Sequence, residues 1–168
     1  MVPAESPMSR DEFQFYNRMA EKMDGLHEHI RQQWGVMHTA ARNSSRPDGM
    51  SLRTFLQFCL GFREELTIHH TIEETRVFPV LATRMPAFRP TSHMMAQHEA
   101  IHSGLNDLGI YCQGCLRGIN DFQWKAFRDI LLKFGPVLWE HLDTEVHELG
   151  AHQIRKYWSK DEVLRMPM

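Results

Sequence analysis

The sequence lacks the features of an exported or membrane-spanning protein. No stretch of eighteen apolar residues occurs anywhere in the chain, so no membrane span is predicted. The N-terminal stretch MVPAESPMSRDEF has no continuous apolar segment of the kind that a signal peptide contains. We therefore expect a cytoplasmic protein that does not associate with a membrane.

Cysteine is also scarce. The chain contains three cysteines, Cys59, Cys112 and Cys115. So small and odd a number does not suit a disulfide framework. This composition is compatible with a reducing compartment. The spacing of Cys112 and Cys115 could be that of a redox pair or of half a zinc site. No second CxxC motif follows and no strand-helix pattern surrounds the pair, so we disfavour both interpretations.

Charge of either sign is not in excess. The formal net charge is -2, and acidic and basic residues are interspersed along the chain. A protein that binds nucleic acid is expected to present a basic face, and none is indicated here, so we predict no nucleic-acid partner. The length of 168 residues fits one domain with a sizeable core. We assign residues 1–168 to a single domain.

Strand-like alternation, internal repeats and low-complexity segments are absent, whereas helical periodicity is strong. A capping box at Ser9 predicts a first helix that ends near Arg42. The loop-type segment NSSRPDGM follows, and Ser51 can then cap a second helix that extends to about Ala82. Pro86 and Pro90 mark the next break because proline lacks an amide hydrogen and restricts the residue before it.

Two further helices complete the pattern. The third is expected to begin near Thr91 or Ser92 and to end among the glycines at 114 and 118. Asn120 or Asp121 would cap the fourth, in which Gly135 and Pro136 should cause a kink or an interruption. Four long helices with short connections predict an all-α fold, an antiparallel up-down four-helix bundle over about residues 9–154. Residues 155–168 would form a short C-terminal arm or extra helix.

Histidine is the residue type that is over-represented, with eleven in the chain. Several of them are followed or preceded four residues away by Glu or another His, a spacing that places both side chains on one face of a helix. In the stretch HHTIEETRVFP, His69 and Glu73 share a stripe with Leu66 and Val77. We therefore expect His69 and Glu73 to face inward, and His70 and Glu74 to lie toward the rim.

The same test of helical phase on the other helices selects a set of inward-facing polar residues. The full set is His27, His69, Glu73, His98, His102, His141 and Glu145. Burying charged carboxylates without partners costs several kcal/mol each, so a purely structural role for all seven is disfavoured. Seven ligands exceed what one tetrahedral zinc needs but suit two metal ions that share bridging carboxylates. Imidazole and carboxylate ligands without thiolate favour iron over manganese or zinc.

These residues resemble those of the hemerythrin-like, or HHE cation-binding, domains. The resemblance is carried by GLHEHIRQQW, HHTIEETRVFP, QHEAIHSGL and FGPVLWEHLDTE, spread over roughly residues 20 to 150. It implies two irons bridged by Glu73, Glu145 and a solvent-derived oxo or hydroxo group. His98, His102 and His141 would complete one iron, while His27 and His69 would bind the other and leave a position open for dioxygen.

Three functions share this predicted site. The chain could bind dioxygen for storage, sensing or redox defence, it could oxidise a small organic substrate, or it could handle iron without redox chemistry. Glu145 follows His141 at a spacing of four, whereas oxygen-carrying hemerythrins have an aspartate at a spacing of five. This departure argues against a simple reversible carrier, and the oligomeric state is not indicated by the sequence.

Overall fold

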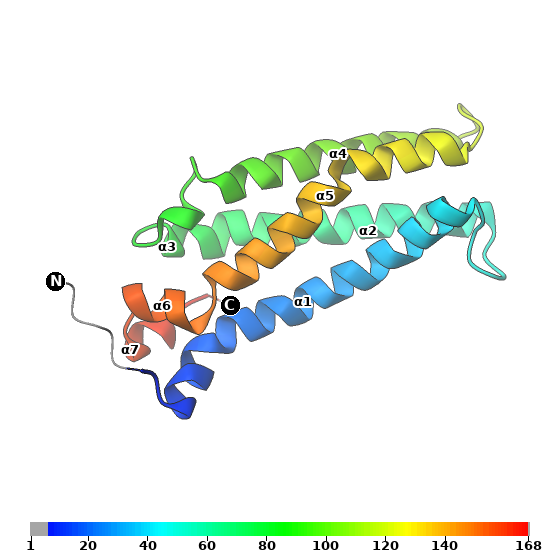
Figure 1. The fold of residues 1–168 in the computed structure, drawn as a ribbon. Coiled ribbons are helices and arrows are strands. Elements are labelled where there is room, and N and C mark those ends of the chain that lie inside the picture. The colour runs from blue at the N-terminus through cyan, green and yellow to red at the C-terminus, as the bar shows by residue number, and fades with distance from the viewer. Residues whose placement is uncertain (1–6, 168) are drawn as a thin grey trace.

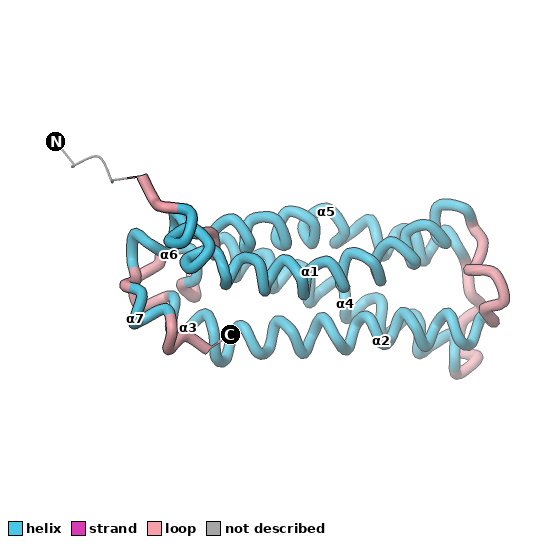
Figure 2. Tube along the Cα trace, turned by 90° about the horizontal axis from the view of Figure 1, so that it is seen from below, coloured by secondary structure: helices cyan, strands magenta, loops and turns pink. Residues whose placement is uncertain are grey.

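The computed structural model describes residues 7–167, and it consists of helices joined by loops (Figures 1 and 2). No strand occurs within that range, so the prediction of an all-α chain is confirmed for it. The helices are α1 (Arg10–Asn43), α2 (Leu52–Ile72), the π-helix η1 (Glu73–Val77), α3 (Phe78–Leu81), the 3-10 helix η2 (Pro86–Phe88), α4 (His93–Leu116), α5 (Trp124–Glu148), α6 (Ala151–Tyr157) and α7 (Lys160–Val163).

Local capping signals account for three of the long helices. Ser9 forms a capping box with Glu12 at the start of α1, because each side chain accepts a hydrogen bond from the other residue's backbone amide. The hydroxyls of Ser51 and Ser92 accept amide hydrogen bonds at the starts of α2 and α4. All three helices therefore begin where the sequence predicted.

The start of α5 differs from the prediction. The helix begins at Trp124, after Gln123 and without a side-chain cap, so the expected caps Asn120 and Asp121 are wrong. The reason is a tertiary contact. The Tyr111 hydroxyl on α4 donates to the carbonyl of Gln123 at 3.1 Å and accepts from its amide at 2.7 Å, which holds this residue in an extended conformation.

Pro136 does not interrupt α5, which is helical on both sides of it. Figure 1 shows the helix changing direction about midway along its length. A Cβ atom on the neighbouring Gly135 would lie 2.7 Å from Cζ2 of Trp34, so only glycine lets the Trp34 ring lie against the α5 backbone. The Gly-Pro step thus allows a close approach of α1 and α5.

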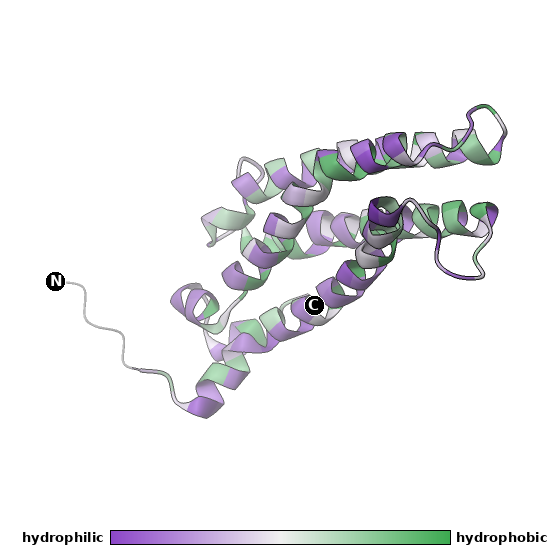
Figure 3. Ribbon diagram, turned by 45° about the vertical axis from the view of Figure 1, so that its right-hand side comes forward, coloured by the Kyte–Doolittle hydropathy of each residue, from purple (hydrophilic) through white to green (hydrophobic). Residues whose placement is uncertain are grey.

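Successive long helices run in opposite directions, and each packs against two others (Figure 1). α1 packs against α2 and α5, and α4 packs against the same two helices, which encloses an interior. Figure 3 shows hydrophobic and hydrophilic residues distributed around each long helix, as expected where one side is buried. In the described part of the chain, none of the helices combines the length and the apolar character that crossing a membrane requires.

The interior contains two apolar clusters. The first, which we call the distal core, includes Phe55, Phe62, Phe127 and Phe134 and lies toward the loops that follow α1 and α4. The second, the terminal core, includes Met23, Phe78, Phe88, Trp158 and Val163. Among residues 7–167, the buried polar residues belong to neither cluster.

The C-terminal segment packs against the rest of the chain. α6 and α7 contact α1, and Trp158 and Val163 are buried in the terminal core. The guanidinium of Arg84 donates to the Tyr157 carbonyl at 2.8 Å and pairs with Glu162 at 2.6 Å, and it lies over the Trp158 ring. The predicted arm, residues 155–168, thus contains the end of α6 and the whole of α7, while α6 begins earlier, at Ala151.

Candidate metal centre

A π-helical turn shapes the part of the site that comes from α2. Pro79 has no amide hydrogen, so the carbonyl of Thr75 cannot receive the hydrogen bond that an α-helix would give it. The amide of Phe78 instead bonds to the carbonyl of Glu73, five residues back. Such wide turns occur frequently at functional sites. Here the turn begins at Glu73, one of the residues predicted to bind metal.

Two groups of potential ligands lie side by side in the interior. In each group, one nitrogen or oxygen from every residue lies within 4.8 Å of the others. The first group consists of His70, Glu73, His98 and His141, and the second of His27, His69, Glu73 and Glu145. Only His69 among them is partly exposed. The structure thus brings together six of the seven residues predicted from sequence, from α1, α2, η1, α4 and α5.

The two carboxylates are placed to connect the groups. Oε1 of Glu73 lies 2.7 Å from Nε2 of His69, and its Oε2 lies 3.4 Å from Nε2 of His98. Oε2 of Glu145 lies 3.2 Å from Nε2 of His27 and 3.7 Å from Nε2 of His141. Each carboxylate therefore approaches imidazoles of both groups, as a bridging ligand would.

The outer nitrogens of three histidines are fixed by hydrogen-bond acceptors. Nδ1 of His27 lies 3.1 Å from the Leu142 carbonyl, and Nδ1 of His98 lies 2.7 Å from Oε1 of Glu74. Nδ1 of His141 lies 3.3 Å from Oε1 of Gln97. Since each of these oxygens accepts a hydrogen bond, the proton of each neutral ring is on Nδ1, and Nε2 carries a lone pair that points inward.

These tautomers make the centre unsatisfied without a cation. The Nε2 atoms of His98 and His141 face each other at 3.0 Å, although neither carries a proton to donate. Nε2 of His27 faces a carboxylate oxygen of Glu145 in the same way. Both oxygens of Glu73 and of Glu145 are buried without a hydrogen bond of acceptable geometry. A cation between them would satisfy all these atoms, so the residues fit bound metal.

The electrostatics favour the forms that bind metal through nitrogen. Burial, followed by the neighbouring rings of His98, His27 and His69, lowers the pKa of His141 to about 2. Burial also lowers the pKa of His69 and His98, and lowers that of His70 well below its ordinary value. These imidazoles are therefore neutral at pH 7, with their lone pairs available to a metal.

The pKa of Glu73 is shifted in the opposite direction from those of the histidines. Burial, followed by the negative charges of Glu145 and Glu74, raises its pKa well above the ordinary value. An ionised carboxylate at this position needs a positive partner, and no lysine or arginine forms an ion pair with it in the described part of the chain. A bound cation would supply that charge and keep the carboxylate ionised.

The structure corrects the placement of His70. The prediction that His70 lies toward the rim is wrong, because its side chain is fully buried and belongs to the first group. His102 lies outside both groups and its side chain is partly buried, but its Nε2 is buried without a hydrogen-bond partner, so its role as a ligand stays a prediction. The His70 ring lies between His98 and His102, with ring centroids 3.8 Å and 5.2 Å away.

One signal in the sequence could have identified His70. It lies four residues after Leu66 and three before Glu73, both of which face inward, so its helical phase is as favourable as that of His69. His98 lies level with Glu74, to which it bonds, and His102 lies one helical turn, or about 6 Å, farther along α4. Position along the helix axis, which periodicity does not reveal, decides between the two histidines.

The residues next to the ligands form an outer layer. Glu74 lies at the margin, with its side chain 30% exposed, and holds His98. Gln97 is buried and connects His141 to His93, whose Nε2 lies 3.2 Å from the Gln97 amide nitrogen. Such partners orient the metal-binding rings. The sequence placed Glu74 near the site correctly but did not single out Gln97.

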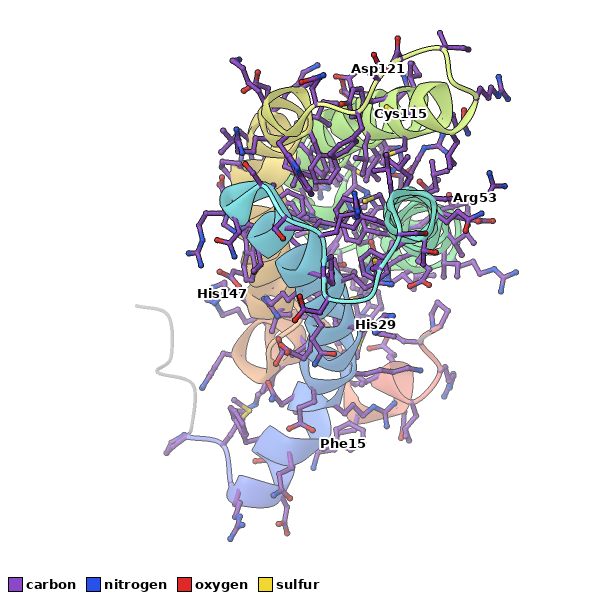
Figure 4. The ribbon with its side chains drawn as sticks, turned by 90° about the vertical axis from the view of Figure 1, so that its right-hand side faces the viewer. Phe15, His29, Arg53, Cys115, Asp121 and His147 are labelled. Carbon is purple, nitrogen blue, oxygen red and sulfur yellow. The ribbon has the colours of Figure 1, made fainter. Side chains whose placement is uncertain are left out.

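The other histidines lie outside the centre. His29 and His147, both labelled in Figure 4, are exposed. His38 stacks on Trp34 and His152 lies near Phe13, both at the surface. The cysteines are unpaired and lie in or beside the distal core, so they contribute to neither ligand group.

Comparison with known proteins gives a family that is consistent with a metal centre. The description "Hemerythrin HHE cation binding domain" matches residues 18–152, which include both ligand groups. The chain is also similar to the dimeric xanthone biosynthesis cluster protein R11 of Cryptosporiopsis sp. (strain 8999), with 36% identity over 95 residues. That match covers 55% of this chain but only 34% of the relative. No solved structure matches the chain significantly. By its match over most of its length, the chain belongs to the hemerythrin HHE cation-binding domain family.

Proposed function

We propose that this protein binds two iron ions and dioxygen. The chain would form a single hemerythrin-like domain, an antiparallel four-helix bundle over residues 9–154 with the arm 155–168 packed on it. The nitrogens of His98 and His141 that face each other carry the proposal, because a cation between them would satisfy two buried lone pairs 3.0 Å apart. Histidine and carboxylate ligands without thiolate favour iron over zinc, with manganese as the other candidate.

The ligand sets support an unequal pair of metals. His70, His98 and His141 would hold one ion, His27 and His69 would hold the other, and Glu73 and Glu145 would bridge them. The second ion has one histidine fewer, and this difference favours an open position for dioxygen there. When bound, an iron pair supplies the electrons for binding or reducing dioxygen.

The surrounding residues would control access and orientation. The distal and terminal cores lie on either side of the polar layer and exclude bulk water from it. Glu74, Gln97 and the Leu142 carbonyl keep three imidazoles in the tautomer that binds metal. Each of these partners acts through a ligand and would contact neither the metal nor dioxygen.

The test is anaerobic reconstitution with ferrous iron, followed by metal analysis and by visible spectra before and after oxygen is added. We expect about two irons per chain and an oxygen-dependent absorption band that fades under vacuum. The Glu73→Ala protein serves as the control and should give neither. One zinc per chain, or no metal, would overturn the di-iron proposal.

A second candidate is oxidation of a small organic substrate by the same centre. The relative's name places it in a biosynthetic cluster for dimeric xanthones, which are aromatic organic products. If this candidate is correct, the oxygen-dependent band should decay faster when a suitable aromatic compound is present. A band whose lifetime no aromatic compound changes favours oxygen binding or sensing instead. Iron handling without redox chemistry would give metal binding and no oxygen-dependent band.

A further inference from the structure

A groove lies between α1 and α5, outside the metal centre. It has a volume of about 610 Å³, and its walls include Trp34, His38, Leu132, Pro136 and Trp139. This volume is within the range of small-molecule sites, which are mainly apolar with a few placed polar groups. Trp34 and Phe134, whose rings meet edge to face at 5.3 Å, lie between the groove and the interior. The groove is thus separate from the ligands described above.

Gly35 keeps one wall of the groove open. A Cβ atom at this position would meet no atom within 4 Å, so packing does not require glycine here. Glycine within a helix costs about 1 kcal/mol relative to alanine, so α1 would be more stable with a side chain. Gly135 differs, because Trp34 lies directly against it and forms the floor. The groove therefore depends on both glycines: Gly135 permits the contact with Trp34, and Gly35 leaves space without a side chain.

The exposed apolar surface of the groove is suited to a flat organic molecule. Leu132 is 65% exposed and Trp139 is 39% exposed, values that are high for large apolar side chains within a helix. Pro136 lacks the amide that would otherwise bond to the Leu132 carbonyl, so this wall also has a hydrogen-bond acceptor without its usual helical partner. An aromatic ring would cover the exposed parts of Leu132 and Trp139.

The charged groups of the groove select an anion. Arg42 and Arg128 line it, and no aspartate or glutamate does so among the described residues. Nη1 of Arg128 donates to the Ala41 carbonyl at 2.8 Å and to the Ser44 hydroxyl at 2.7 Å. These bonds fix the guanidinium and leave its remaining N–H groups for a ligand. Arginine recognises carboxylates through two parallel hydrogen bonds, which is the geometry that a fixed guanidinium offers.

The polar and apolar parts lie at opposite ends. Both arginines are near the end of α1 and the start of α5, whereas Trp139 lies eleven residues beyond Arg128, about 16 Å along the helix at 1.5 Å per residue. We propose that the groove binds an aromatic carboxylic acid, with its carboxylate at Arg42 and Arg128 and its rings along Leu132, Pro136 and Trp139. This inference does not rest on the metal chemistry, because no metal ligand lines the groove.

The test is calorimetric titration of the metal-loaded protein with 2-naphthoate as the probe. Gly35→Leu should fill the groove and weaken binding at least about tenfold, whereas Gly61→Leu, at a helical glycine on α2 that is equally free of contacts, should bind like the unaltered protein. Arg42→Ala should weaken naphthoate binding by about five- to tenfold and leave 2-naphthalenemethanol, the neutral analogue, unaffected. Thermal melts of each variant verify folding.

Three results would overturn the proposal. The first is saturable naphthoate binding that Gly35→Leu does not change, because the ligand would then lie elsewhere. The second is an absence of saturable binding to the unaltered protein. The third is a dimer in sedimentation experiments that Gly35→Leu dissociates, because a second copy of the chain would then occupy the groove. Repeating the titration on metal-free protein separates this proposal from the di-iron one, since naphthoate binding should persist.

Discussion

The distal core and the metal centre are equally buried but are stabilised in different ways. Phe55 and His27 both have no exposed surface. Phe55 packs against other aromatic rings, including Phe127 at a centroid distance of 5.5 Å, so its burial is favourable in itself. His27 faces Glu145 with a lone pair, and burying these atoms is unfavourable until a cation joins them. Burial alone therefore does not distinguish a core from a site, whereas unsatisfied polar atoms do.

The largest expected effect comes from removing a bridge. Glu73→Ala deletes the one residue that belongs to both ligand groups, so we expect the loss of both metals. Glu74→Ala removes only the acceptor that holds His98, and it should retain both metals with affinity reduced about 10- to 100-fold. Metal analysis after dialysis against a weak chelator measures both. If Glu74→Ala lost metal and Glu73→Ala did not, Glu74 rather than Glu73 would be the metal ligand.

The next effect separates His70 from His102. His70→Ala should lose the metal of the first group and keep that of the second, because His27 and His69 are unchanged. His102→Ala should keep both metals, since His102 belongs to neither ligand group. The measurement is again metal content per chain, with iron spectra to show whether a paired centre persists. The reverse result would restore the ligand set that the sequence predicted.

The histidines also show what a sequence can and cannot reveal. Helix starts at Ser9, Ser51 and Ser92 were predictable because a cap is a local interaction. The start of α5 was not, because the Tyr111 hydroxyl that fixes it is distant in sequence. Helical phase found most of the buried polar residues. It could not choose between His70 and His102, because that choice depends on how far α4 has shifted along α2.

Mutations in the distal core should change the free energy of unfolding by the same amount with and without bound metal. Phe55→Ala removes a fully buried ring and should lower the free energy of unfolding by about 3–5 kcal/mol. The loss should be the same for metal-loaded and metal-free protein, since Phe55 belongs to neither ligand group. Chemical denaturation of both forms checks this. A metal-dependent loss would mean that the two regions are energetically coupled.

The smallest of these effects is a pH dependence that only the metal centre should show. In the metal-free protein, burial holds the pKa of His141 at about 2, far below the 6.5 that is ordinary for histidine. As the pH falls below 6.5, the unfolded chain gains a proton at this residue and the folded chain does not, so stability decreases. Between pH 7 and pH 5 this residue alone should lower the free energy of unfolding by about 2 kcal/mol.

The remaining groups determine the net sign. His69, His70 and His98 also have lowered pKa values and act in the same direction as His141. Glu73 acts in the opposite direction, because its raised pKa lets the folded chain hold a proton that the unfolded chain releases above about 4.5. Four imidazoles oppose one carboxyl, so the melting temperature of metal-free protein should fall from pH 7 to pH 5. His141→Asn should reduce this slope. An unchanged slope in His141→Asn would show that the imidazole is already solvated.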